Sequence, residues 1–298
     1  MKVPTMSEEE TLRESRNRAR QEFAQRYPLR EIDVDGVPWS FIAGGRGDST
    51  ILWLHGATGD AYQMQRFVQP LVDETRFIAP TIPAVDRLES VFRGLDAILA
   101  EQNVDRLLVA GGSFGGMIAQ AFARQSAERL DGLMLFDTAV PNADVAQRNR
   151  RQMAVLRHLP WPLLRWAFTK SLGRLLRVPG ELTEEQKLEL SLAAERFRES
   201  MRRVTKERLL AHSALAHEFF ASDPAAAGWS GPTLVIRSKD DPSQKGLAGP
   251  ESIYPKVRLI EIDAGVGHLG SLLRCEDYLT AFREFIEARS LRVLTETA

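Results

Sequence analysis

Nearly continuous apolar runs alternate with amphipathic helical patterns along most of the chain. The apolar runs end where small or polar residues begin, and they cover 50–56, 76–82, 106–112, 132–138, 232–238 and 257–263. Hydrophobic residues recur with a helical period over 62–72, 88–102, 114–125 and 276–288. Strands that are apolar on both faces and alternate with helices predict a mainly parallel sheet with helices on both sides. We therefore expect an α/β fold, with reactive residues at the carboxyl ends of its strands.

The first part of the chain adds a helix and a hairpin to this pattern. Strands over 30–34 and 37–44 flank Asp35-Gly36, a pair typical of hairpin turns. Ser7, followed three residues later by Glu10, has the spacing of a capping box and predicts a surface helix that ends near Arg26. This charged segment lacks the apolar core of a signal peptide, and no stretch is apolar enough to span a bilayer. We expect a cytoplasmic protein without a membrane span.

Residues 140–227 interrupt the alternation, because they contain several helical patterns and no convincing strand. The chain then divides into an N-terminal helix (1–27), an α/β core domain (28–139 and 228–298) and a helical insertion (140–227) that lies over the sheet as a cap. From Gln147 to Gly180 the insertion has basic residues and no acidic ones. Such a stretch either binds a membrane surface or packs its apolar side chains on the underside of the cap. Those side chains are Trp161, Leu164, Trp166 and Phe168.

The composition adds few constraints. Hydrophobic residues make up 44% and charged residues 27% of the 298 positions, as in an ordinary globular protein. The formal net charge of -1 gives no overall attraction to nucleic acid, which we do not expect as a partner. The only cysteine, Cys275, excludes an intrachain disulfide and fits a reducing compartment. Its position near a predicted helix start indicates a structural role.

Ser113 lies in the pattern G-x-S-x-G, formed by Gly111-Gly112-Ser113-Phe114-Gly115. The pattern alone arises by chance in roughly one chain in ten of this length. Here it ends a predicted strand and opens a predicted helix, which is the setting of a nucleophile elbow, where glycines let strand and helix approach. A phosphate-binding loop is the alternative, but the G-x-G-x-x-G spacing and the Walker lysine are absent. We therefore predict that Ser113 is a nucleophile.

A serine hydroxyl needs a base to accept its proton. His268 follows the last predicted strand in a loop bracketed by glycines, and we expect it to act as base and acid. The histidines of the helical insertion are expected to pack or to lie at the surface. Asp241 follows the penultimate strand, gives the order Ser, Asp, His along the chain, and is predicted to orient the imidazole. Asp137, which ends the strand after the serine helix, and Asp240 are alternatives for this acid.

The sequence LHGATG, residues 54–59, supplies a glycine-rich turn after an earlier strand. Acyl transfer needs N–H donors where the oxyanion develops. We expect the backbone N–H groups of Ala57 and Phe114 to provide them, with Gly56 in the same turn. Thr58 either adds its hydroxyl or stabilises the turn. No group of His, Cys, Asp and Glu has the spacing of metal ligands, so we expect neither a metal nor a cofactor.

Taken in this order, the motifs resemble the α/β-hydrolase superfamily over roughly residues 29–289. The resemblance rests on LHGATG for the oxyanion loop, GGSFGG for the elbow, SKDDP for the acid turn and GVGHLG for the histidine loop. It implies a serine hydrolase of the Ser–His–Asp type with a helical cap between the sixth and seventh strands. We expect a carboxylic-ester hydrolase whose small-molecule substrate has an apolar portion. A C–C bond hydrolase or an acyltransferase on the same triad is an alternative.

A narrower resemblance links the chain to maspardin and its bacterial relatives. It rests on SKDDPSQKG followed by YPKVRLIEIDAGVGHLGSLLR. Within that group maspardin lacks the histidine and is regarded as a binding adaptor, so the resemblance implies a non-catalytic interaction protein as a second alternative. The presence of His268 here favours an enzyme.

Overall fold

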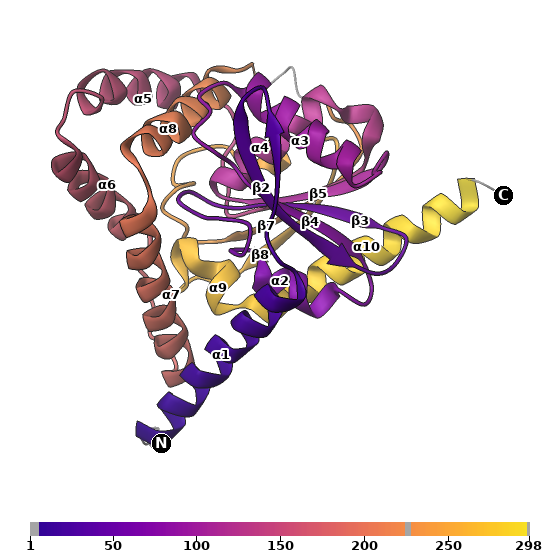
Figure 1. Cartoon of the computed structure of the whole chain (residues 1–298), viewed down its shortest axis with the longest axis horizontal. Helices are drawn as coiled ribbons and strands as arrows, with labels where there is room; N and C mark the ends of the chain where they lie inside the picture. Colours follow the sequence, from indigo (N-terminus) through magenta and orange to yellow (C-terminus); the bar gives the residue numbers. More distant parts are fainter. Residues whose placement is uncertain (1–5, 224–227, 297–298) are drawn as a thin grey trace.

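A single sheet of eight strands organises the computed structural model, which describes residues 6–223 and 228–296 (Figure 1). The strands follow the order β1-β2-β4-β3-β5-β6-β7-β8 across the sheet. β2 is antiparallel to both of its neighbours, and every pair from β4 to β8 is parallel, which confirms the mainly parallel sheet. The strands are β1 (Arg30–Val34), β2 (Val37–Gly45), β3 (Thr50–Leu54), β4 (Arg76–Thr81), β5 (Leu107–Gly112), β6 (Leu130–Phe136), β7 (Pro232–Ser238) and β8 (Lys256–Ile262).

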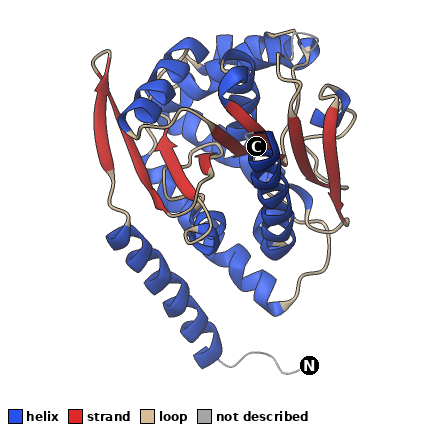
Figure 2. Ribbon diagram, turned by 90° about the vertical axis from the view of Figure 1, so that its right-hand side faces the viewer, coloured by secondary structure: helices blue, strands red, loops and turns tan. Residues whose placement is uncertain are grey.

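Helices cover both faces of the sheet, as Figure 2 shows from the side. Successive side chains of a strand point to opposite faces, so Leu52 and Leu54 of β3 pack with α3 (Leu88–Glu101) and α4 (Phe114–Gln125). Ile51 and Trp53 pack on the other face with the end of α1 (Met6–Arg26), with α2 (Gln65–Val68) and with α10 (Cys275–Glu296). The buried strands therefore read as continuous apolar runs because each face has its own core.

The predicted helices exist, with small differences at their ends. Ser7 lies inside α1, so the predicted N-cap at this residue is wrong; Met6 is a good helix former and continues the helix past it. The helix predicted over 62–72 is shorter and continues as a 3₁₀ turn. The remaining short helices are η1 (Gln69–Leu71), η2 (Ala127–Arg129), η3 (Pro250–Ser252), η4 (Gly267–Leu269) and α9 (Gly270–Leu273).

Four helices fill the described residues between β6 and β7, and no strand lies among them. They are α5 (Ala143–Leu156), α6 (Trp161–Leu175), α7 (Glu184–Arg203) and α8 (Lys206–Ala221). Residues 224–227 at the end of the predicted insertion lie outside the described residues. In Figure 1, α8 lies between the sheet and the outer helices α5 and α6. Within residues 6–223 and 228–296, none of the helices combines the length and hydropathy needed to cross a bilayer.

The large apolar side chains of α6 lie on two different faces of the helix, one buried and one exposed. Leu164 is buried, and Phe168, which lies one turn further on the same face, is half-buried. Trp166 is 62% exposed, so for this side chain the alternative of packing underneath does not hold. It stands two positions after Leu164, and two residues of a helix are about 200° apart around the axis.

A buried carboxylate ties this helical segment to the rest of the chain. Glu189 of α7 is 5% exposed and accepts hydrogen bonds from Arg16 of α1 at 2.9 Å and from Arg66 of α2 at 2.8 Å. A buried charge is tolerated when it is paired and hydrogen-bonded in this way. The contact joins α7 to α1, and the two helices converge at the lower left of Figure 1.

Candidate active site

Ser113 forms a sharp turn between β5 and α4. Its backbone has φ 51° and ψ -121°, a strained conformation for a residue with a side chain. The turn brings backbones into contact, because a Cβ on Gly111 would collide with the Gly115 carbonyl, and a Cβ on Gly115 would collide with the Leu54 carbonyl of β3. The glycines around Ser113 thus allow strand and helix to pack without side chains. The turn leaves Ser113 partly exposed.

This close approach predicts a large cost for a single methyl group. We expect Gly115→Ala to lower the free energy of unfolding by about 3 kcal/mol, because neither backbone segment can move without disturbing the sheet. Gly173→Ala is the matched control, since a Cβ on Gly173 of α6 would have nothing within 4 Å. Alanine favours a helix more than glycine, so this control should gain about 0.5 kcal/mol. Urea unfolding measures both; equal changes would contradict the packing argument.

His268 connects Ser113 to Asp241. Its Nε2 lies 3.0 Å from the Ser113 Oγ, and its Nδ1 lies 2.9 Å from Asp241 Oδ2 and 3.0 Å from Oδ1. The carboxylate can only accept, so Nδ1 carries the proton and Nε2 is left to accept the Ser113 hydroxyl proton. The side chains of His268 and Asp241 are 6% and 0% exposed. The three residues, far apart in sequence, therefore form one continuous hydrogen-bonded chain that reaches the surface only at Ser113.

Asp240, the neighbour of Asp241, holds the histidine loop. Its carboxylate accepts the backbone N–H of Gly265 at 2.7 Å and that of Gly267 at 3.1 Å. Both glycines have positive φ, 114° and 56°, which turns their N–H groups toward one carboxylate. Asp240 thus orders the loop that carries His268, while Asp241 contacts the imidazole itself.

Asp137 lies after β6 and is buried near the same histidine, but it forms its hydrogen bonds with other residues. The carboxylate accepts the Tyr278 hydroxyl at 3.1 Å and the Ser271 N–H at 3.4 Å. Burial raises the pKa of Asp137 to about 7, helped by the charge of Asp241 and opposed by that of His268. Asp137 is therefore an electrostatic neighbour of His268 rather than its hydrogen-bonding partner.

The pKa of His268 results from opposed effects. Burial lowers the pKa of the imidazole, while the hydrogen bond and charge of Asp241 raise it, helped by the charge of Asp137. The raising effects prevail, and the pKa of His268 lies above its ordinary value of 6.5. The imidazole is accordingly a stronger base than a free one, as proton abstraction from a hydroxyl requires.

The turn predicted to hold the oxyanion is partly used within the protein. The Gly56 N–H donates to Gln63 Oε1 at 2.7 Å, so it is occupied by a side chain of the same loop. Thr58 is buried with φ 62°, and its carbonyl accepts the Ser200 hydroxyl of α7. The backbone of Thr58 therefore contributes to the turn, and the role of its hydroxyl stays a prediction. Phe114 is the first residue of α4, where a backbone N–H points out of the helix.

Two residues of α8 support this region: Arg208, which no sequence motif singled out, and His212, which packs as expected for a histidine of the helical insertion. The Arg208 guanidinium donates to the Gly59 carbonyl at 2.6 Å and to the Ile82 carbonyl at 3.2 Å. The His212 ring stacks on Phe114 with centroids 4.8 Å apart and planes 17° apart. Burial, with the charge of Arg208, lowers the pKa of His212 to about 4, so this ring is neutral. The helical segment thus fixes both the turn and the residue after Ser113.

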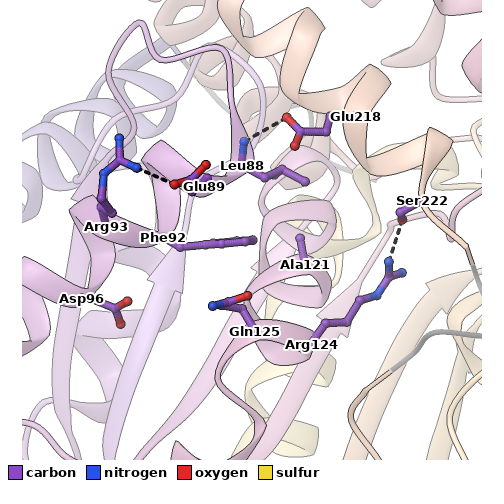
Figure 3. A pocket seen from close by; sticks show the side chains of 10 residues that line it. All are labelled: Leu88, Glu89, Phe92, Arg93, Asp96, Ala121, Arg124, Gln125, Glu218 and Ser222. Carbon is purple, nitrogen blue, oxygen red and sulfur yellow. Dashed lines mark hydrogen bonds and ion pairs between the residues drawn. The ribbon is translucent and has the colours of Figure 1, made fainter.

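A hollow of about 500 Å³ lies between α3, α4 and α8, away from Ser113 (Figure 3). Glu218 accepts the Leu88 N–H at 3.0 Å, and Arg124 donates to the Ser222 hydroxyl at 2.6 Å, so polar groups of the hollow pair with one another. No nucleophile and base meet among its lining residues. Chemistry therefore favours Ser113 over this hollow as the reactive site. The lining residues are Leu88, Glu89, Phe92, Arg93, Asp96, Ala121, Arg124, Gln125, Glu218 and Ser222.

Comparison with known proteins identifies the family. Residues 51–281 match the sequence model of the alpha/beta hydrolase family. The chain belongs to the alpha/beta hydrolase family. No curated protein matches the sequence, so the narrower resemblance to maspardin stays a prediction.

Solved structures of alpha/beta hydrolases share the fold over most of this chain. An esterase from Thermogutta terrifontis is 23% identical, covers 88% of this chain and 98% of its own, and gives a TM-score of 0.67. An enol-lactonase from Burkholderia xenovorans is 17% identical, covers 87% and 100%, and gives 0.65. A variant meta-cleavage product hydrolase is 17% identical, covers 87% and 98%, and gives 0.64. At these identities the likeness shows the fold alone.

Proposed function

We propose that this alpha/beta hydrolase cleaves carboxylic esters through an acyl-enzyme on Ser113. The observation that carries the proposal is the hydrogen-bonded chain from Ser113 Oγ through His268 to Asp241, with distances of 3.0 and 2.9 Å. A nucleophile within reach of a base, which a carboxylate orients in turn, is the arrangement that activates a hydroxyl.

In the proposed mechanism Ser113 Oγ attacks the ester carbonyl while His268 Nε2 takes the hydroxyl proton. The negative charge of Asp241 stabilises the resulting imidazolium. Backbone N–H groups of Ala57 and Phe114 stabilise the oxyanion. The intermediate then expels the alcohol, which takes the proton from His268. Water, deprotonated by the same histidine, attacks the acyl-enzyme and releases the carboxylic acid.

We propose that α5–α8 act as a cap domain and that the substrate carries an apolar acyl or aromatic part. The contacts of Arg208 and His212 with the turn and with Phe114 support the first point. The apolar inner face of α6, with Leu164, supports the second. The single cysteine supports a reducing compartment such as the cytoplasm.

Labelling with a fluorophosphonate probe tests the proposal. These probes phosphonylate an activated serine, so we expect one adduct, mapped by mass spectrometry to the peptide that contains Ser113. A panel of p-nitrophenyl esters of increasing acyl length then reports turnover and the size of the apolar part. Folded protein that forms no adduct and hydrolyses no ester would instead support a non-catalytic interaction protein.

The proposal also predicts the pH dependence of the reaction. We expect kcat/KM to be constant at high pH and to fall as pH drops through the pKa of His268, because the protonated imidazole cannot accept the Ser113 proton. That pKa is raised, so the midpoint should lie above 6.5. Asp137→Asn removes one of the charges that raise it and should move the midpoint to lower pH. Initial rates in a series of buffers measure both, and a native midpoint below 6.5 would count against His268 as the base.

A further inference from the structure

The outer helices α5 and α6 carry charge of one sign. From Gln147 to Gly180 the chain has eight basic residues and no Asp or Glu. All eight side chains are exposed, and none of them forms an ion pair with a carboxylate in the described part of the chain. They are Arg148, Arg150, Arg151, Arg157, Arg165, Lys170, Arg174 and Arg177. The surface therefore holds a concentrated positive charge that the rest of the described protein does not neutralise.

Large apolar side chains are exposed among these cations. Val155 of α5 and Leu163 and Trp166 of α6 are 63%, 54% and 62% exposed. Leu29 and Leu259, the other large apolar side chains exposed among the described residues, reach only 46% and 36%. Leu163 and Trp166 lie three positions apart on α6 and so are neighbours on one helix face, and exposed apolar side chains that adjoin one another mark an interaction surface more often than isolated ones do.

The helical period of α6 explains how apolar and basic groups share one face. Leu163, Trp166 and Lys170 follow at spacings of three and four, so they form one stripe along the helix. The Lys170 ammonium lies 4.8 Å from the centroid of the Trp166 ring. Gly173 continues the stripe, and a Cβ there would meet nothing within 4 Å. Leu164 is buried on the opposite side. α6 is thus packed on one face and open on the other.

A hollow beside this stripe adds a place for an anionic group. It has a volume of about 190 Å³ and lies between α6 and α7. Arg165, Arg198 and Arg202 line it, with Phe197 beside them. None of these three guanidinium groups pairs with a carboxylate within residues 6–223 and 228–296. Arginine clusters of this kind bind phosphate oxygens with paired N–H donors.

We propose that the outer surface of α5 and α6 binds the headgroup layer of an anionic lipid bilayer, with Trp166 and Leu163 inserted at the boundary between headgroups and acyl chains. A helix with a basic face and exposed Trp and Leu side chains suits this layer, where lysine and arginine reach the phosphates and apolar groups enter below them. Each cation near an anionic membrane adds attraction, so the effects of eight accumulate.

The exposed apolar side chains decide between lipid and nucleic acid, which is also a polyanion. Val155, Leu163 and Trp166 would remain in water against a phosphate backbone, whereas a bilayer removes them from water. The proposal concerns a surface outside the Ser113 site and does not depend on the proposed hydrolysis.

Sedimentation of the full chain with lipid vesicles tests the proposal. We expect binding to vesicles of phosphatidylcholine mixed with phosphatidylglycerol, weak binding to phosphatidylcholine alone, and release by high salt because salt screens the charges. Lys170→Gln with Arg174→Gln should lower the partition coefficient roughly thirtyfold. Arg46→Gln with Lys256→Gln is the matched control, because these cations are exposed elsewhere on the protein, and it should bind like the native chain.

Two substitutions of Trp166 test insertion. Trp166→Ala should weaken vesicle binding about fivefold, whereas Leu29→Ala, at another exposed apolar position, should not. Trp166→Phe should keep binding but remove the blue shift of tryptophan fluorescence on vesicle addition. Thermal unfolding and hydrolysis of a soluble ester check that each variant is folded.

Several outcomes would overturn the proposal. These are no binding to anionic vesicles, equal losses in the Lys170/Arg174 and Arg46/Lys256 pairs, and a polynucleotide that displaces the protein from vesicles. A dimer that Trp166→Ala dissociates, seen by light scattering without any vesicle binding, would assign the surface to a second copy of the chain.

Discussion

Replacing Ser113 with alanine is expected to lower kcat for ester hydrolysis by about 10⁵-fold while leaving the fold intact. The Ser113 hydroxyl supplies the attacking oxygen and lies 3.0 Å from His268 Nε2, which accepts its proton. Alanine has no side-chain oxygen, so the imidazole has no nucleophile to activate at this position. The strained backbone of Ser113 is kept, because alanine has the same Cβ. The free energy of unfolding should change by less than about 1 kcal/mol. Steady-state assays and urea unfolding on the same samples measure the two quantities.

Ser126 provides a matched control for this change. It is the C-cap residue at the other end of α4, and its side chain is buried. We expect Ser126→Ala to hydrolyse esters at close to the native rate and Ser113→Ala to lose the fluorophosphonate adduct. Turnover retained in Ser113→Ala, or lost equally in both variants, would mean that Ser113 is not the nucleophile.

The sheet and the elbow could be predicted because their signals are local. Strands buried on both faces must be apolar throughout, and all eight predicted strands are present at nearly the expected bounds. The glycines at 111 and 115 reflect backbone contacts that no side chain permits, so their spacing around Ser113 is readable from the sequence. The elbow depends on residues within two positions of Ser113, and central strands such as β3 and β5 depend on burial that is the same at every position along them.

Features that depend on tertiary packing could not be predicted in this way. Asp137, Asp240 and Asp241 all follow strands that end at one edge of the sheet, and sequence order left all three open. Their hydrogen bonds differ because the local backbone directs each carboxylate differently, as the φ of 45° at Asp137 illustrates. The stacking of His212 on Phe114 similarly depends on where α8 lies over the elbow.

The choice of acid leads to a second prediction of large effect. Asp241→Asn is expected to lower kcat about 10⁴-fold. The amide keeps the shape of the carboxylate but loses its charge, so it no longer stabilises the imidazolium. Its N–H₂ group can also donate to His268 Nδ1, which moves the ring proton to Nε2. In that tautomer Nε2 cannot accept from Ser113. The rate of ester hydrolysis near the pH optimum measures the loss.

Substitutions of the two neighbouring carboxylates, Asp137 and Asp240, are the controls. Each is expected to change activity or stability differently from Asp241→Asn. Asp137→Asn keeps an acceptor for the Tyr278 hydroxyl and should change kcat less than about tenfold, since only the charge near His268 is removed. Asp240→Asn retains one oxygen for two N–H groups and should loosen the histidine loop, lowering stability as well as rate. A 10⁴-fold loss in Asp137→Asn, with a modest one in Asp241→Asn, would make Asp137 the acid that orients His268.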